Sequence, residues 1–166
     1  MRKLFLVILI ALSGTINAFA GDQNSAQQSV IDSLSFELKS LRHDYEFLYC
    51  ESSLNDLKHD LDVFKNNLDS NSNSMVINMY HSRFNSDLYY SYKENYRSSV
   101  GYFDSLKESV NQLKYLIYLK MENSNYGFSE TEINVLESKI DVIDKGVKSV
   151  EASLNYQKVV LDAYMR

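Results

Sequence analysis

The sequence predicts an all-α protein, an antiparallel up-down-up bundle of three long helices preceded by a signal peptide. Three observations support this fold class. The 166-residue chain contains no proline and only five glycines, and proline is the residue that most often ends helices and marks tight turns. Apolar residues recur every three or four positions over three long stretches, as on one face of a helix. The polar segments between these stretches are short, which makes neighbouring helices antiparallel.

The first twenty residues have the order of a secretory signal peptide. A basic MRK precedes the nine-residue apolar run LFLVILIAL, and Ala18 and Ala20 form an A-x-A cleavage site. The run is too short to cross a bilayer as a helix, and an uncleaved N-terminal anchor is the alternative. We expect cleavage after Ala20 and a periplasmic or extracellular product. Residues 21–166 then form a single helical-bundle domain without a transmembrane segment.

The first predicted helix covers about residues 25–68. Ser25 and Gln28 match the S-x-x-Q capping box that begins many helices. Apolar residues follow in alternating steps of three and four at Ile31, Leu34, Leu38, Leu41, Tyr45 and Leu48. The pattern resumes in another phase at Leu54, Leu57, Leu61, Phe64 and Leu68. Residues 50–53 therefore mark either a bend in the helix or a shift of its apolar seam, as in a coiled-coil stammer.

The second and third helices are predicted at about residues 75–121 and 130–165. The polar segments DSNSNS, residues 69–74, and ENSNYG, residues 122–127, are expected to be the two loops. The second helix has an apolar face from Ile77 to Ile117 with a period close to that of a straight helix. Ser129 and Glu132 form a capping box at the start of the third helix.

Five tyrosines lie in the stretch LYYSYKENYRSSVGY, residues 88–102. With the first loop centred near residue 72, Tyr92 lies level with Glu51, and Tyr96 lies level with Phe47. We therefore expect these tyrosines to fill the core beside the phase change, since large residues opposite small ones give close packing. An aromatic platform for a glycan or a peptide is the alternative.

Three small residues have predicted roles in packing. Gly101 and Gly146 fall at the same level of the second and third helices, either to let these helices approach closely or as two independent surface glycines. Cys50 is the only cysteine, so an intramolecular disulfide is excluded. It is expected either to be buried as a small hydrophobic residue or to form an intermolecular disulfide.

A partner-binding surface is predicted at the tip formed by the first two helices. The third helix should end level with about Phe84, so this tip extends beyond it by roughly 13 Å at 1.5 Å per residue. Two helices cannot cover every apolar side chain there, and exposed apolar patches often mark protein contacts. Packing of the tip on itself or on a second copy is the alternative. The predicted residues are Leu61, Phe64, Leu68, Met75, Val76, Ile77, Met79 and Tyr80.

Charge and motifs argue against several classes of function. The net charge is −5, and it becomes −7 without residues 1–20, which contain Arg2 and Lys3 and no acidic residue. Nucleic acid and anionic membranes are therefore not expected partners. Asp56 and His59 form a single D-x-x-H turn without a second copy, so no metal site is expected. Glycine-rich phosphate loops are absent from the sequence, and we expect no cofactor and no catalytic residues.

The remaining expectation is an exported, non-enzymatic helical protein that acts by binding an unidentified protein partner. Such a protein could be an inhibitor, an adaptor or an immunity-type protein. Acidic charge on a rigid helical surface suits a basic or apolar partner. A structural or chaperone-like helical oligomer of the cell envelope is the alternative, and the sequence leaves a homo-oligomer open.

Overall fold

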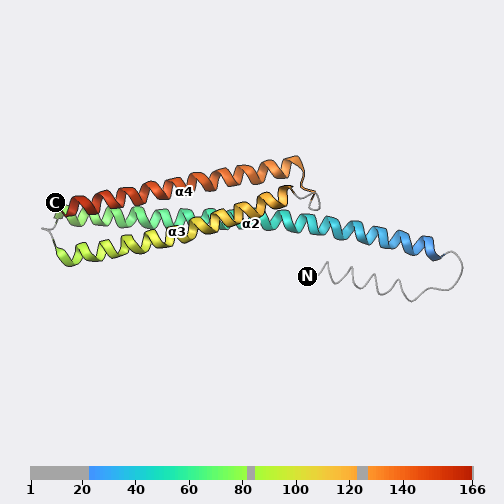
Figure 1. Ribbon diagram of the computed structural model, residues 1–166, viewed down its shortest axis with the longest axis horizontal. Coiled ribbons are helices and arrows are strands. Elements are labelled where there is room, and N and C mark those ends of the chain that lie inside the picture. The colour runs from blue at the N-terminus through green and yellow to red at the C-terminus, as the bar shows by residue number, and fades with distance from the viewer. Residues whose placement is uncertain (1–22, 82–84, 123–126, 166) are drawn as a thin grey trace. The chain divides into compact units, whose positions relative to one another are not determined.

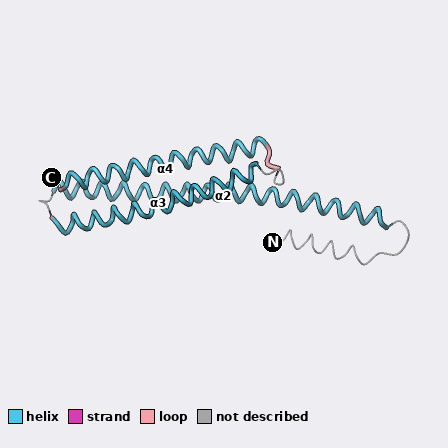
Figure 2. Tube along the Cα trace, viewed as in Figure 1, coloured by secondary structure: helices cyan, strands magenta, loops and turns pink. Residues whose placement is uncertain are grey.

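The computed structural model describes residues 23–81, 85–122 and 127–165 (Figure 1). These residues form helices α2 (Gln23–His81), α3 (Ser86–Glu122) and α4 (Glu130–Tyr164). The helices pack together, and no strand occurs within the described ranges (Figure 2). The prediction of an all-α protein with three packed helices is therefore confirmed. The predicted signal peptide, residues 1–20, lies outside the described residues.

The chain divides into two compact units, Met1–Glu46 and Phe47–Arg166. The boundary lies within α2, and the helix is continuous through residues 50–53, where the apolar pattern changes phase. In the first unit, the described residues are all helical. In the second unit, the rest of α2 packs with α3 and α4. The single domain expected over residues 21–166 stays a prediction.

Two apolar clusters form the core of the second unit. The smaller one contains Met75, Tyr89, Val160, Leu161 and Tyr164. The larger one consists of residues from all three helices, namely Cys50, Leu54, Leu57, Leu61, Leu68, Phe103, Leu106, Val110, Ile117, Leu136, Ile140, Ile143, Val150 and Leu154. Burial of such side chains is the main stabilising contribution to a domain without disulfides.

Polar contacts at two levels join α2 to α4. The Lys139 ammonium donates to Asn55 Oδ1 at 2.8 Å, and the Ser153 hydroxyl donates to Asp69 Oδ1 at 2.6 Å.

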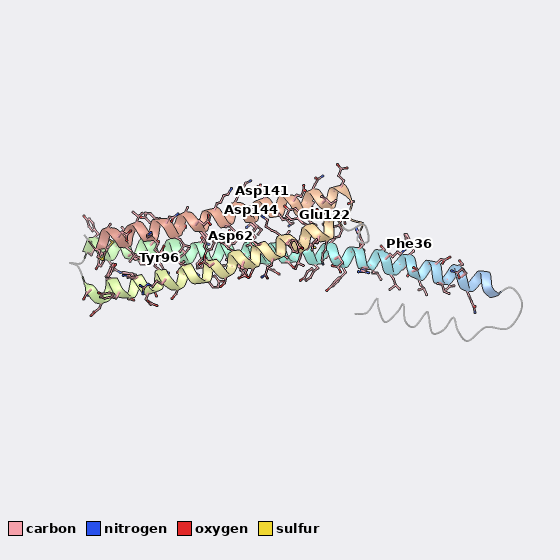
Figure 3. All side chains as sticks on the ribbon, in the orientation of Figure 1. Phe36, Asp62, Tyr96, Glu122, Asp141 and Asp144 are labelled. Carbon is pink, nitrogen blue, oxygen red and sulfur yellow. The ribbon has the colours of Figure 1, made fainter. Side chains whose placement is uncertain are left out.

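Two ion pairs join α3 to α4. Lys107 lies 2.7 Å from Glu151, and Lys114 lies 2.7 Å from Asp144, which is labelled in Figure 3.

The predicted loop at residues 69–74 is wrong, because α2 continues through it to His81. Serine and asparagine often mark loops because their side chains compete for backbone hydrogen bonds. Here the Ser72 hydroxyl donates to the Leu68 carbonyl at 2.8 Å, and the Ser74 hydroxyl donates to the Ser70 carbonyl at 3.0 Å. These bonds are compatible with a helix, and the segment contains no glycine or proline. Burial of Ser72 between the helices outweighs the weak local propensity.

The turn between α2 and α3 lies about ten residues later, between His81 and Ser86. The Asn85 side chain caps α3 by accepting hydrogen bonds from the backbone N–H groups of Asp87, at 3.0 Å, and Leu88, at 3.1 Å. The Asn85 N–H also donates to the Tyr164 hydroxyl at 3.3 Å. The end of α4 therefore lies beside this turn, and the protruding tip that we expected does not exist.

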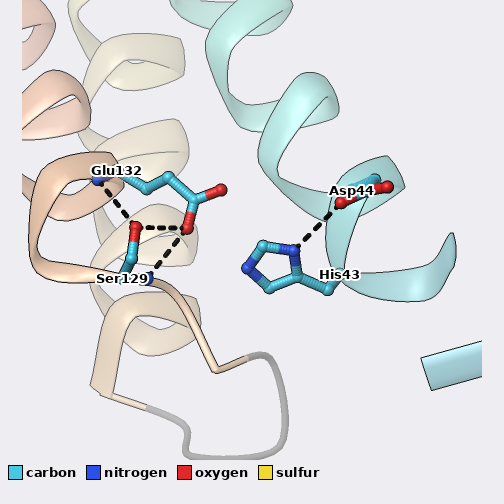
Figure 4. Close-up of polar contacts among 4 residues, drawn as sticks. All are labelled: His43, Asp44, Ser129 and Glu132. Carbon is cyan, nitrogen blue, oxygen red and sulfur yellow. Dashed lines mark hydrogen bonds and ion pairs between the residues drawn. The ribbon is translucent and has the colours of Figure 1, made fainter. Parts of the chain in front are cut away.

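The second loop lies where the sequence predicts it, because α3 ends at Glu122 and α4 begins at Glu130. Gly127 has a φ of 62°, a left-handed conformation that glycine adopts readily. The predicted capping box is confirmed (Figure 4). The Glu132 N–H donates to Ser129 Oγ at 3.3 Å, and the Ser129 N–H donates to Glu132 Oε2 at 2.8 Å.

Part of the tyrosine-rich stretch packs in the core, but not beside the phase change, and Tyr90 and Tyr102 are exposed. Tyr89 is buried and stacks on Tyr164 with ring centroids 6.3 Å apart. Tyr92 accepts a hydrogen bond from Asn78 rather than lying level with Glu51. Tyr96 is half-buried against both clusters. The shifted turn explains the error, since it places the end of α2 opposite the start of α3.

The predicted pairing of the two glycines is also wrong. Gly101 is exposed, and no atom lies within 4 Å of the position that a Cβ would take there. Gly146 faces Leu61 of α2, whose Cδ1 would lie 3.3 Å from such a Cβ. Cys50 is buried in the larger cluster, the first of the two roles that the sequence allowed.

Candidate functional site

The eight residues of the predicted partner-binding surface have different environments. Leu61, Leu68 and Met75 are fully buried and cannot contact a partner without unfolding, so their assignment to an exposed surface is wrong. They are buried because α4 extends as far as the end of α2. Phe64 and Met79 are half-buried against the core. The three exposed residues are Val76, Ile77 and Tyr80.

A shallow apolar groove lies between the end of α2 and the end of α4. Its volume is about 370 Å³, and it is lined by Val76, Met79, Tyr80, Val159, Val160 and Ala163. Tyr80 is 85% exposed, and Val159 is 65% exposed. Tyr80 also makes an edge-to-face contact with His81, with ring centroids 5.2 Å apart. Val160 is the buried residue of the groove, Met79 is half-buried, and Tyr80 is an exposed aromatic residue that lines it.

Few charged residues surround this groove. No Asp, Glu, Lys or Arg occurs from residue 70 to residue 81 of α2. On α4, Lys158 and Asp162 are the charged neighbours in sequence of the lining residues. Depletion of charge together with tyrosine and methionine is the composition found at the centre of protein interfaces.

Sequence reasoning found half of this groove and missed the other half. Val76, Met79 and Tyr80 were predicted as interface residues, whereas Val159, Val160 and Ala163 were not. The α4 residues were missed because the wrong turn position placed the end of α4 too far from the end of α2. The N-cap signal at Asn85, followed by an acidic residue in the first turn of α3, could have located the turn.

A buried polar layer lies next to the groove, between the two apolar clusters. It contains Ser72, Ser153 and Gln157, and the Gln157 Oε1 atom has no hydrogen-bond partner. The hydrogen bond from Lys65, followed by the one from Ser153, lowers the pKa of the Asp69 carboxyl below its ordinary value. Since Asp69 accepts from both helices, we interpret this layer as fixing the register of α4 on α2.

The described residues contain no cluster of three or more His, Cys, Asp or Glu side chains that could hold a metal ion. His43 contacts the neighbouring Asp44 at 3.2 Å (Figure 4). None of the described helices combines the length and the apolar character needed to cross a membrane. Comparison of the chain with protein-family models, curated proteins and solved structures finds no match.

Proposed function

We propose that this chain is an exported, non-enzymatic helical protein that acts by binding another protein in the periplasm or extracellular space. An inhibitor, adaptor or immunity-type role suits such a protein. The basic, apolar and small-residue order of residues 1–20 supports export with cleavage after Ala20. The groove between α2 and α4 is the single observation that carries the binding role.

The partner proposed for this groove is an amphipathic helix that presents aliphatic side chains. A helix laid between two others buries its apolar face in the groove that they form. Because residues 70–81 contain no Asp, Glu, Lys or Arg, the interaction depends on apolar contact rather than on ion pairs. Binding should therefore change little between low and high salt, unlike binding steered by surface charges.

We also propose that the second unit is an up-down-up bundle. The opposite direction of the α3–α4 contacts supports antiparallel packing, and the common direction of the α2–α4 contacts supports parallel packing of those two helices. Zero-length cross-linking should join Lys107 to Glu151 and Lys114 to Asp144. Cross-links from Lys107 to the opposite end of α4 would contradict this topology.

The experiment compares three tagged proteins in a pull-down from the compartment in which the native protein occurs. They are the wild type, a groove variant with Val76→Lys and Val159→Lys, and a control variant with Val63→Lys and Val142→Lys. The control valines are also exposed but do not line the groove. We expect one partner to be retained in high salt by the wild type and the control, and to be lost by the groove variant. Equal retention by all three proteins, or release by salt alone, would contradict the proposal.

Export is tested separately by mass spectrometry of the protein recovered from the native cells. We expect an N-terminus at Gly21. A full-length chain retained in the cytoplasm would overturn the export proposal without affecting the result of the pull-down.

A structural or chaperone-like oligomer is the second candidate function. The specific observation in its favour lies in the first unit, where several large apolar side chains of α2 are exposed. They include Val30, Ile31 and Phe36, the last of which is labelled in Figure 3.

A further inference from the structure

The described part of the first unit carries an exposed apolar stripe along α2. We define the stripe as Ile31, Leu34, Leu38, Leu41 and Tyr45, of which Leu34 is half-buried and the others are exposed. Ile31 is 57% exposed, Leu38 is 52% exposed and Tyr45 is 66% exposed. A single helix that exposes such a row to water leaves much of the available burial energy unused.

The spacing of the stripe is that of a coiled coil. Its members follow one another in alternating steps of three and four residues, a period of 3.5. The apolar face that is buried in the second unit is in a different phase, because continuing the stripe in the same steps through Leu48 leads to Ser52 and Asn55, whereas Leu54 and Leu57 are the buried residues. A period of 3.5 suits a left-handed supercoil between two helices.

The residue types in the stripe favour two parallel strands. With Ile31 at heptad position a, Leu34 and Leu41 occupy the two d positions. Leucine at d with a β-branched residue at a favours parallel dimers over higher oligomers, a combination that the stripe has at Ile31 and Leu34. Leu38 and Tyr45 then fill the other two a positions.

The charges beside the stripe fit a second copy of the same chain. Glu37 falls at position g and Arg42 at position e, five residues later. In a parallel dimer, residue g of one chain lies beside residue e of the next heptad in the other chain, so that Glu37 meets the partner's Arg42 twice by symmetry. In an antiparallel dimer, g residues lie beside g residues, and Glu37 would face Glu37 or Asp44 of the other chain and be repelled.

We propose that residues 30–45 of α2 form a parallel two-stranded coiled coil with the same segment of a second copy. The stripe forms the seam, and the Glu37–Arg42 pairs between the chains set the orientation. This site is independent of the groove between α2 and α4, which remains available for a different protein. Helix α2 extends well beyond the stripe, so this short coiled coil requires no separate nucleation of a helix.

Sedimentation equilibrium of the purified wild-type protein over micromolar concentrations is the first test. We expect a reversible dimer. A protein that stays monomeric at about a hundred micromolar would overturn the proposal.

Exchanging the charges of Glu37 and Arg42 tests whether the partner is a second copy of the chain and whether the two helices are parallel. The single variants Glu37→Lys and Arg42→Glu each convert two attractive contacts per dimer into repulsive ones, so each should weaken self-association about tenfold. The double variant Glu37→Lys/Arg42→Glu should recover the wild-type value, because the pairs are attractive again with reversed signs. Residues five apart do not face each other on one helix, so recovery reports contacts between chains. Single variants that associate as well as the wild type would refute the parallel arrangement.

The seam itself is tested by a matched pair of exposed residues. Leu38→Lys changes a seam position and should abolish the dimer. Phe36→Lys changes a residue that is 75% exposed but lies at position f, outside the seam, and should leave the dimer intact. Thermal melting of both variants checks that the second unit still folds. Equal loss of association in both variants would indicate non-specific aggregation, and an unaffected Leu38→Lys dimer would place the contact elsewhere.

Discussion

The two helical glycines provide a matched test of the packing of α4 on α2. Gly101 is an exposed residue near the middle of α3, and a Cβ built there would meet no atom within 4 Å. Alanine has a helix propensity about 1 kcal/mol better than glycine, partly because it restricts the unfolded chain. The variant Gly101→Ala should therefore gain nearly the whole of this difference. For a domain of this size, that gain corresponds to a rise in Tm of about 4 °C.

Substitution of Gly146 by alanine gains the same helix propensity, but the environment of Gly146 is different. A Cβ at Gly146 would lie 3.3 Å from Leu61 Cδ1 and 3.7 Å from Leu61 Cβ. Leu61 is only 1% exposed, so its methyl group has little room to move in the close-packed core. Overpacking of this kind costs about 1 to 3 kcal/mol. We therefore expect Gly146→Ala to be neutral or destabilising, with a Tm several degrees below that of Gly101→Ala.

Urea denaturation and thermal melting followed by circular dichroism measure both variants. A double variant, Leu61→Val/Gly146→Ala, adds a control because valine has no Cδ1. Its free energy of unfolding should exceed the value expected from the two single changes by about 0.5 kcal/mol or more, as for residues in contact. If Gly146→Ala is as stable as Gly101→Ala, then α4 does not approach α2 at Leu61, and the packing deduced here is refuted.

Two further predictions concern pH and helix capping. The pKa of Asp69 is lowered by its hydrogen bonds from Lys65 and Ser153. The stabilising effect of the Asp69 carboxylate is therefore present above the ordinary Asp pKa of about 4, and it is lost as pH falls through the lower pKa of the folded state. Between pH 6 and pH 3, urea titrations should show a larger loss of unfolding free energy for the wild type than for Asp69→Asn; equal losses would exclude a role for this carboxylate. Asn85→Ala removes the acceptor for two N–H groups at the start of α3 and should cost about 1 kcal/mol; an unchanged denaturation midpoint would contradict the cap.

The sequence predicts the fold class and the second loop because these depend on strong local signals. The capping box of Ser129 and Glu132 fixes the start of α4, and Gly127 supplies the left-handed residue that precedes it. The first loop was misplaced because the polar composition of residues 69–74 resembles a loop, although Ser72 continues the apolar face at the correct spacing from Leu68 and Met75. In this segment the spacing of the buried face predicts the helix that forms, whereas the polar composition predicts a loop.

The candidate site shows how one boundary error spreads through a helical protein. In a bundle, a residue's neighbours on the next helix depend on the position of the turn, so a shift of about ten residues changes every contact between α2 and α3. Tyr92 therefore meets Asn78 instead of Glu51. The apolar character of Val76 and Tyr80 was read correctly, but their partners on α4 could not be found from the wrong turn.

The change of apolar phase in α2 has a physical meaning that the sequence alone left open. The seam with a period of 3.5 ends near the boundary between the two units, at Glu46 and Phe47, and the buried face of the second unit begins with Phe47 and Cys50. A helix that keeps one partner along its length needs only one seam, because its apolar face must stay turned to that partner. Two seams in different phases, one exposed and one buried, are expected where a single helix serves two sets of partners. In this chain, the buried seam packs on α3 and α4, and the exposed seam is the one that we propose for a second copy.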